Sequence, residues 1–351
     1  MKTIAGAVVV VALLVAALAW SRSTMGTAPP SEAGVRLIDV GYLPVTCHLT
    51  CPVTDFTTRT SAANRFVSQR FTDFPTMVEA MKSGRLEAAF LIAPLAMKLR
   101  EQGVAVRIVY LGHRDGSTIM VATDSPARSL ADLRGRTIAF PSRFSNQYLV
   151  MRKLMRDAGI GPDDFALVEL PPPEMPAALA SRAIDAYFVG EPHAARAELD
   201  GTGRVLHHAK DIWPGFVSCV LVVTERLIAA GDEAIATGRI AVGDEPVRDL
   251  VRGIARSGAW AETHRLEAAR LVAPYFRQDE KLLHHVLTQP PDRVSYRMLT
   301  PSMEEFTAIR DMAIEAGILG APIPIPELLD LRFIPDEIAE LDLTAAAGAR
   351  P

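Results

Sequence analysis

One segment near the N-terminal end of the sequence carries two thiols and an imidazole within five residues. Cys47, His48 and Cys51 lie in residues 41–56 (GYLPVTCHLTCPVTDF). The cysteines are four residues apart, so a helical turn would place both thiols on one face. The segment has neither the Cys-x-x-Cys-His pattern of c-type haem attachment nor the paired cysteines of a structural zinc site. It therefore indicates thiol chemistry without fixing its kind.

Three interpretations of these cysteines stay open at the level of sequence. They could be unreactive small residues that line or support a pocket. They could form a disulfide in an oxidising compartment, either Cys47–Cys51 or one of these two with Cys219. They could bind a soft metal ion, because thiolates select soft ions. Cys219 lies in the β-rich run 217–223 (VSCVLVV), which we place at the junction of two lobes, so three sulfurs could converge there.

A second group of polar residues follows a short strand expected at 137–140 (TIAF). Ser142, Ser145 and Asn146 are all residue types that cap helix N-termini, and the segment after them is amphipathic at helical spacing. A helix N-terminus offers free N–H groups and partial positive charge, which suit a carboxylate, sulfonate or nitrate. An ordinary N-cap is the alternative. Arg143 could supply a charge to an anion or lie solvated in the loop.

The overall composition limits the class of protein. Of 351 residues, 49% are hydrophobic and 22% are charged, which supports a sizeable core and excludes disorder for most of the chain. Lys and Arg total 37 against 41 Asp and Glu, a net charge of −4 that argues against a general nucleic-acid binder. Three cysteines are too few for a disulfide scaffold. No P-loop, HExxH motif or Ser/His/Asp order appears, and we expect neither an enzyme nor a cofactor.

The N-terminus is typical of an exported protein. A positive residue precedes the apolar run 4–20 (IAGAVVVVALLVAALAW), and 17–19 (ALA) fits a cleavage site, so residues 1–20 are interpreted as a signal peptide. An uncleaved membrane anchor is the alternative, although the run is slightly short for a full span. Residues 21–34 are rich in small and polar residues and are expected to form a flexible tether. The folded part should then begin near Val35, in the periplasm or another extracytoplasmic space.

Strands and helices alternate along the rest of the sequence. The expected order strand–helix–strand–helix–strand begins at Val35 and begins again at residues 117–123 (STIMVAT). This order is typical of sheets with crossover helices. After residue 223 the pattern is mainly helical. We therefore predict an α/β protein of two lobes, each a mainly parallel sheet flanked by helices, with a ligand cleft between them and crossings at 117–123 and 217–223. The predicted boundaries are 35–121 for the first part of lobe 1, 122–218 for lobe 2, 219–343 for a helical return to lobe 1, and 344–351 for a disordered tail.

Three segments resemble the extracytoplasmic solute-binding proteins of ABC importers, in the nitrate/sulfonate/taurine group. Residues 78–103 (VEAMKSGRLEAAFLIAPLAMKLREQG) match the family's block of helix, glycine, acidic-Ala strand and small-Pro loop. Residues 129–165 (SLADLRGRTIAFPSRFSNQYLVMRKLMRDAGIGPDDF) match its block of strand, Ser-containing loop, helix and glycine. Residues 178–197 (ALASRAIDAYFVGEPHAARA) match its small-residue helix, Asp-Ala strand and Glu-Pro. The blocks stand in the family's order, and the resemblance covers about 35–342.

The resemblance implies a type II periplasmic-binding fold, in which hinge closure of two lobes buries a small molecule and no catalysis takes place. It implies a ligand loop at residues 41–56 and further contacts at strand ends that face the cleft. None of the expected ligand-binding residues is assigned as a metal ligand. These residues are Tyr42, Thr46, Cys47, His48, Thr50, Cys51, Ala93, Pro94, Ser142, Arg143, Phe144, Ser145, Asn146, Glu191, His193 and Cys219.

The function implied by the resemblance is capture of a small solute and its delivery to the transmembrane subunits of an ABC permease. The solute could be a sulfonate, nitrate, or a neutral, heterocyclic or organosulfur molecule. Because no cationic residue lies between Gly41 and Arg59, a strongly anionic ligand would depend on Arg143 or on helix N-termini. We expect no nucleic-acid partner, and contact with the membrane only through the permease or an uncleaved anchor.

Two alternative functions compete with solute delivery. One is a soft-metal or redox module that uses Cys47, His48, Cys51 and Cys219. The other, on the same fold, is an enzyme similar to the pyrimidine-forming thiamine-precursor synthases. Those enzymes carry four cysteines within five residues, a run that is absent from this sequence.

Overall fold

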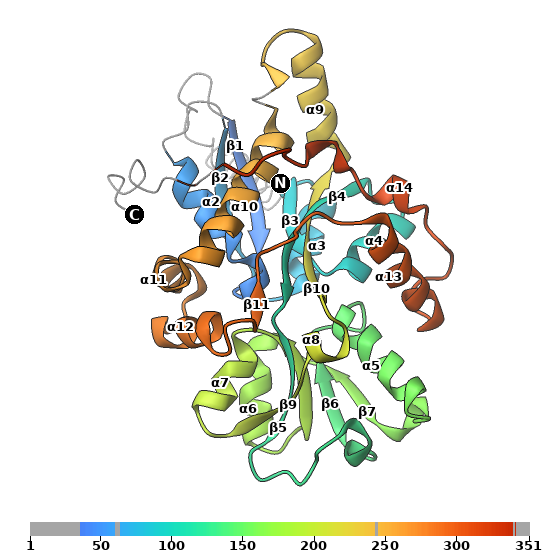
Figure 1. The fold of residues 1–351 in the computed structure, drawn as a ribbon. Helices are drawn as coiled ribbons and strands as arrows, with labels where there is room; N and C mark the ends of the chain where they lie inside the picture. Colours follow the sequence, from blue (N-terminus) through green and yellow to red (C-terminus); the bar gives the residue numbers. More distant parts are fainter. Residues whose placement is uncertain (1–35, 60–63, 243–244, 340, 342–351) are drawn as a thin grey trace, which may run out of the picture.

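The computed structural model describes residues 36–59, 64–242, 245–339 and 341, and this part of the chain forms two β-sheets that stand end to end (Figure 1). Helices flank each sheet, and the prediction of a two-lobed α/β protein is confirmed. The expected signal peptide, tether and tail lie outside the described residues. Within the described residues, no helix combines the length and hydrophobicity that a membrane span requires.

The first sheet combines strands from both ends of the described chain. Its strands are β1 (Arg36–Tyr42), β2 (Asn64–Arg70), β3 (Ala88–Leu91), β4 (Val106–Asp115), β10 (Val217–Thr224) and β11 (Val294–Ser295). They lie in the order β11-β4-β10-β3-β1-β2. β2 and β3 pair parallel with β1, whereas β10 and β11 pair antiparallel with their neighbours. The mainly parallel sheet predicted from the sequence is wrong in this respect, because β10 enters from the other lobe and runs against β3 and β4.

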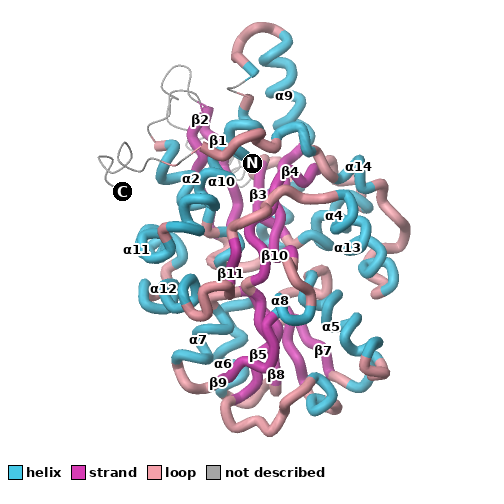
Figure 2. Tube along the Cα trace, in the orientation of Figure 1, coloured by secondary structure: helices cyan, strands magenta, loops and turns pink. Residues whose placement is uncertain are grey.

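Helices from the C-terminal half return to this first lobe (Figure 2). α10 contacts α2, and α13 contacts α4. In α10, Val247, Leu250 and Ile254 recur at helical spacing and are fully buried, so one apolar face docks on the lobe. The helices are α2 (Thr50–Thr58), α3 (Phe74–Lys82), α4 (Ala93–Glu101), α9 (Glu225–Ala236), α10 (Pro246–Thr263), α11 (Arg265–Phe276), α12 (Glu280–Thr288), α13 (Met303–Glu315) and α14 (Ile325–Leu328), with 3₁₀ turns η1 (Thr46–His48) and η6 (Leu331–Phe333).

The second sheet lies in the middle of the chain. Its strands are β5 (Ser117–Ala122), β6 (Thr137–Phe140), β7 (Ala166–Glu169), β8 (Ala186–Gly190) and β9 (Gly203–His208), in the order β7-β6-β8-β5-β9. β6 pairs parallel with β7 and β8, whereas β5 pairs antiparallel with β8 and β9, so this sheet is also mixed. Its helices are α5 (Asn146–Asp157), α6 (Met175–Ala180), α7 (His193–Leu199) and α8 (Ala209–Ile212), with 3₁₀ turns η2 (Leu130–Leu133), η3 (Pro162–Asp164) and η4 (Pro172–Glu174).

The chain passes from the first sheet to the second at Gly116. β4 ends one residue before this glycine and β5 begins one residue after it. Gly116 has a φ of +65°, and a Cβ atom there would lie 2.6 Å from the His113 ring, so glycine suits both the turn and the packing. The predicted crossing strand 117–123 forms β5 and pairs within the second sheet, and the expected boundary between residues 121 and 122 falls inside it.

Strand β4 also supports the loop that follows β1. A Cβ atom on Gly112 would lie 2.1 Å from the carbonyl oxygen of Cys47. This separation is far inside van der Waals contact, so only a residue without a side chain lets the loop backbone approach the strand this closely. The η1 turn packs against β4 as a result. Gly112 therefore sets the position of the cysteine-containing loop.

Replacing Gly112 with alanine should lower the free energy of unfolding by about 1–3 kcal/mol, because strand and loop must separate to admit a methyl group. Urea unfolding measures the change. Gly161→Ala is the matched control, since a Cβ atom there would meet only Asp164 atoms at 3.7 Å or more. Equal stability of the two variants would show that the loop does not depend on this close approach.

Candidate functional site

The two lobes meet where the loop after β1 touches the residue that follows β8. The backbone N–H of Thr46 donates to the carbonyl oxygen of Glu191 at 2.7 Å. The Thr46 hydroxyl donates to the same oxygen at 3.3 Å and lies 2.9 Å from Nε2 of His113. Since Thr46 follows the carboxyl end of β1 and Glu191 that of β8, these bonds join strand ends from both sheets. This is the place where open α/β sheets bind ligands.

In the loop after β1, two of the three sulfurs come together. Cys47 Sγ lies 2.7 Å from Sγ of Cys219, which is on β10. The Cys51 thiol instead donates to the carbonyl oxygen of Val40, at 3.7 Å. Cys47 lies in the 3₁₀ turn η1 and Cys51 lies in α2, and the two thiols contact different groups. The loop residues expected to bind ligand are all at most 3% exposed: Thr46, Cys47, His48, Thr50 and Cys51.

The imidazole of His48 completes this group. Its Nδ1 accepts a hydrogen bond from the N–H of Leu43 at 2.7 Å and lies 3.2 Å from the carbonyl oxygen of the same residue. Its Nε2 is buried and has no hydrogen-bond partner. A ring nitrogen of His48 and the sulfurs of Cys47 and Cys219 all lie within 4.8 Å of one another. We call these three residues the thiol–imidazole cluster.

The two thiols of the cluster differ in acidity. Burial raises the pKa of a thiol, but the hydrogen bond with Cys219 and the neighbouring His48 hold the pKa of Cys47 well below its ordinary value. Burial and the adjacent Cys47 raise the pKa of Cys219 well above its ordinary value. Cys47 therefore loses its proton before Cys219. Burial also lowers the pKa of nearby His113 to about 4, which leaves its ring neutral at pH 7.

The serines of the second predicted group accept hydrogen bonds from backbone N–H groups. The Ser145 hydroxyl accepts the N–H of Tyr148 at 3.2 Å and is the N-cap of α5. The Ser142 hydroxyl accepts the N–H of Phe144 at 3.1 Å. Both serines are buried next to the end of β6. They hold the start of α5 at the junction of the lobes, as the capping alternative predicted.

Two buried amides at the start of α5 offer free acceptors. The Asn146 amide nitrogen donates to the carbonyl oxygen of Val217 at 2.6 Å, and the Gln147 amide nitrogen donates to the Ser117 hydroxyl at 3.1 Å. Oδ1 of Asn146 and Oε1 of Gln147 are buried without a hydrogen-bond partner. Gln147 was missed from the sequence, although it is adjacent to Asn146. Buried acceptors of this kind require a donor, which a bound solute can supply.

Arg143 lies away from these groups. Its side chain is exposed, with Nε 3.7 Å from a Glu169 carboxylate oxygen, and its guanidinium lies 5.5 Å from the ring centre of Phe144. Phe144 is half-buried. The solvated alternative for Arg143 therefore describes the structure, and its charge is directed to another surface residue.

Glu191 is held by a buried ion pair. Arg293 Nε and the Thr118 hydroxyl donate to Oε1 of Glu191 at 2.7 and 3.1 Å, and the N–H of Ala195 donates to Oε2 at 2.9 Å. Arg293 also pairs with Glu198. Burial lowers the pKa of Arg293, but the two carboxylates outweigh burial and raise it. Both carboxylate oxygens of Glu191 thus have protein partners, and the residue acts as a structural link. Sequence reasoning left Arg293 unassigned because its local sequence (PPDRV) gives no sign of burial.

The remaining predicted residues lie at or shortly after the ends of strands β1, β3 and β8. The Tyr42 hydroxyl donates to the carbonyl oxygen of Tyr275 at 2.9 Å, and its ring is buried in the first lobe. Ala93 and Pro94 begin α4 and are buried. His193 begins α7, its Nε2 has no hydrogen-bond partner, and burial lowers its pKa to about 4.

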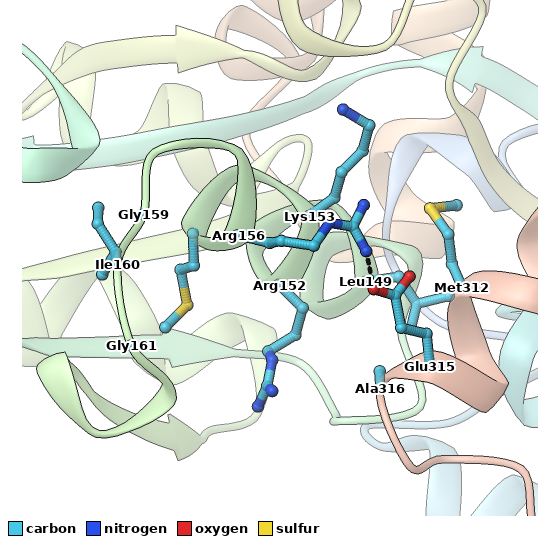
Figure 3. Close-up of a pocket in the computed structure, with 11 residues that line it drawn as sticks. Leu149, Arg152, Lys153, Arg156, Gly159, Ile160, Gly161, Met312, Glu315 and Ala316 are labelled. Atoms are coloured by element: carbon cyan, nitrogen blue, oxygen red, sulfur yellow. Dashed lines mark hydrogen bonds and ion pairs between the residues drawn. The ribbon is translucent and has the colours of Figure 1, made fainter.

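A separate cavity of about 420 Å³ lies at the surface between α5 and α13 (Figure 3). Arg152, Lys153 and Arg156 of α5 line it together with Glu315 of α13, and Arg156 forms an ion pair with Glu315. This pair joins the lobes on the outside of the molecule. The strand-end residues described above do not line this cavity.

The sequence of residues 33–238, more than half of the chain, matches the profile of a known family. The chain belongs to the NMT1-like family. It is 31% identical over 144 residues to a putative aliphatic sulfonates-binding protein of Escherichia coli, which covers 39% of this NMT1-like chain and 44% of the relative. It is 32% identical over 168 residues to a putative binding protein of Brucella abortus, which covers 47% and 51%. The NMT1-like chain thus spans about half the length of these relatives.

Solved structures resemble the NMT1-like chain over most of its length. The ligand-binding component of an ABC-type import system from Staphylococcus aureus, with zinc bound, superposes with a TM-score of 0.74 at 25% identity and covers 87% of this chain and 100% of that one. The alkanesulfonate-binding protein SsuA of Xanthomonas axonopodis, bound to MOPS, gives 0.68 at 17% identity, with 85% and 99% covered. The nitrate-binding protein NrtA of Synechocystis gives 0.68 at 14% identity, with 82% and 83% covered. The last two likenesses show the fold.

Replacing Arg293 with methionine should lower the free energy of unfolding by about 3–5 kcal/mol, because it leaves the Glu191 carboxylate buried without its counter-ion. Urea unfolding of the purified protein measures this. Adding Glu191→Gln to the same variant should recover part of the loss. Arg143→Met is the matched control at an exposed arginine, and we expect a change within about 0.5 kcal/mol. A similar loss in the control would contradict the special role of Arg293.

Proposed function

We propose that this protein is the solute-binding component of an ABC importer, which closes two lobes around a small solute and releases it unchanged to a permease. The observation that carries the proposal is the contact between strand ends of the two sheets, through Thr46 and Glu191. A ligand held at this junction would be enclosed by residues from both lobes. Hinge closure is the usual way in which two-lobed proteins of this kind bury a ligand.

The polar groups at the junction support a ligand site. Oδ1 of Asn146, Oε1 of Gln147 and Nε2 of His48 are buried without hydrogen-bond partners, and they come from both lobes. Unpaired buried polar groups are uncommon in native proteins because each costs about 1–3 kcal/mol. A solute that pairs with them would offset this cost and stabilise the closed arrangement.

The charges at the junction favour a neutral or cationic solute over an anion. Arg293 is paired with Glu191 and Glu198, and Arg114 at the end of β4 is paired with Glu305. An anion would have to compete with these carboxylates, of which Glu191 is fully buried, for a positive charge. The polar acceptors of Asn146 and Gln147 instead suit a solute that carries donors.

The names of similar proteins support a role of this protein in solute transport. Similar proteins include a putative sulfonates-binding protein and, at 28% identity over 170 residues, a nitrate import ATP-binding protein of Synechocystis. By analogy, the partners of this protein are the permease subunits and the ATPase of an importer. The apolar N-terminal segment fits export to an extracytoplasmic space, where such a protein meets its solute.

A screen of solutes with the purified protein tests the proposal. A true ligand at 100 times its Kd should add about 2.7 kcal/mol of stability, seen as a thermal shift, and should reduce the radius of gyration measured by small-angle X-ray scattering. Turnover of a stabilising solute into a different molecule would contradict a pure binding function.

Variants at the junction then locate the site. Asn146→Ala should weaken the binding of such a solute about ten- to a hundredfold, as expected for the loss of a buried polar contact. Arg143→Ala, an exposed change only three residues away, is the control and should leave the affinity unchanged. Affinity is measured by calorimetry after circular dichroism has shown that both variants are folded. Equal affinities for both variants would place the ligand elsewhere.

A further inference from the structure

We propose that the thiol–imidazole cluster of Cys47, His48 and Cys219 is a binding site for one soft monovalent metal cation, copper(I). This inference does not depend on the proposed function. It concerns only whether three buried side chains bind a metal ion.

The donor set is the first argument. Two sulfurs and one imidazole nitrogen lie within 4.8 Å of one another, and all three residues are at most 3% exposed. Thiolate sulfur and imidazole are the ligands that soft metal ions prefer, and copper(I) is the typical ion for sites rich in thiolate. The donors come from segments far apart in the chain, the η1 turn and β10, so the fold itself assembles the group.

The orientation of His48 is the second argument. Its Nδ1 lies 2.7 Å from the N–H and 3.2 Å from the carbonyl oxygen of Leu43, which fixes the ring. Metal-binding histidines usually engage a backbone carbonyl or carboxylate with the nitrogen that does not bind the ion. Because Nδ1 accepts the Leu43 N–H, the neutral ring carries its proton on Nε2, the buried atom without a partner. Binding of copper(I) through Nε2 therefore requires this proton to move to Nδ1, where it can be donated to the Leu43 carbonyl oxygen.

The number of donors distinguishes between metals. Structural zinc sites are almost always four-coordinate. Among the described residues, no fourth cysteine, histidine or carboxylate belongs to the group of Cys47, His48 and Cys219. The Cys51 thiol bonds to the Val40 carbonyl, and His113, with Nε2 against the Thr46 hydroxyl and Nδ1 buried without a partner, lies outside the group. A three-donor set with two sulfurs therefore suits copper(I) better than zinc.

Binding needs no oxidant or reductant. The sulfurs of Cys47 and Cys219 share one hydrogen bond at 2.7 Å. Copper(I) entering the group would form two sulfur–copper bonds and one nitrogen–copper bond, and the protons of the two thiols would be released to solvent. The sulfurs would have to move apart to admit metal–sulfur bonds of about 2.3 Å, the length found in thiolate zinc sites. The copper stays in the +1 state throughout.

The test is an anaerobic titration of the reduced, purified full chain with copper(I), in competition with the chromophoric chelator bicinchoninate. We expect one copper(I) per chain and an ultraviolet absorption from thiolate-to-copper charge transfer. Cys47→Ser and Cys219→Ser should each weaken binding by at least about a hundredfold, the upper end of the effect of losing an outer-sphere partner of a metal site. Cys51→Ser is the matched control, a buried cysteine of the same segment that should bind copper(I) as the unmodified chain does.

Several outcomes would overturn the site. These are an absence of copper(I) binding by the reduced chain, an equal loss in the Cys51→Ser control, and undiminished binding by either of the other two variants. A Cys47–Cys219 disulfide found by mass spectrometry of the isolated protein, with no copper(I) binding after reduction, would identify the pair as a structural cross-link. Circular dichroism of each variant separates loss of binding from loss of folding.

Scattering with and without copper(I) separates this inference from the proposed function. Compaction of the protein by copper(I) supports both. Compaction by another solute, in a protein that does not bind copper(I), overturns only the metal site. Tight copper(I) binding without compaction by copper(I) or by any screened solute overturns the transport role and leaves a metal site that has no cargo function.

Discussion

The arrangement of the lobes depends on the need to satisfy one buried carboxylate. Glu191 is fully buried, so its charge must be matched within the protein, and Arg293 from the C-terminal part of the chain matches it. The same residue receives hydrogen bonds from β5 through Thr118 and from α7 through Ala195, while its backbone carbonyl accepts from Thr46 of the first lobe. One residue thus ties together the second sheet, the C-terminal return and the cysteine-containing loop. The junction of the two lobes is built around this link.

Much of the fold could be predicted because the sequence repeats a local signal. Alternating strands and helices, closed by glycines and prolines, indicated two α/β units, and the resemblance blocks indicated how they join. The direction of individual strands could not be predicted in the same way. β10 looks like any buried strand from its composition, and its antiparallel pairing with β3 and β4 follows only from its entry out of the second lobe. Pairing partners are a property of the whole chain path, which local patterns do not encode.

In the candidate site as well, features that depend on neighbouring residues could be predicted, whereas contacts between distant residues could not. Ser145 was correctly placed as a cap because capping depends on residues three positions away. The meeting of Cys47 with Cys219 stood among several alternatives, since 172 residues separate them. The four-residue spacing of Cys47 and Cys51 did not predict their partners, because each thiol contacts a group from another segment of the chain. Arg293 could not be found at all, because its partner Glu191 is 102 residues away and a buried arginine looks like a surface arginine in sequence.

The first sheet is assembled from strands that are far apart in the chain, which affects how the protein folds during its synthesis. β11 (Val294–Ser295) pairs with β4 (Val106–Asp115), so the edge of this sheet cannot be completed until nearly 300 residues have left the ribosome. The second lobe, built from residues 117–208, has all of its strands much earlier. The nascent chain therefore holds a second lobe that has all of its strands beside a first lobe whose sheet is still incomplete. An intermediate of this kind is prone to aggregate and is a natural client for chaperones.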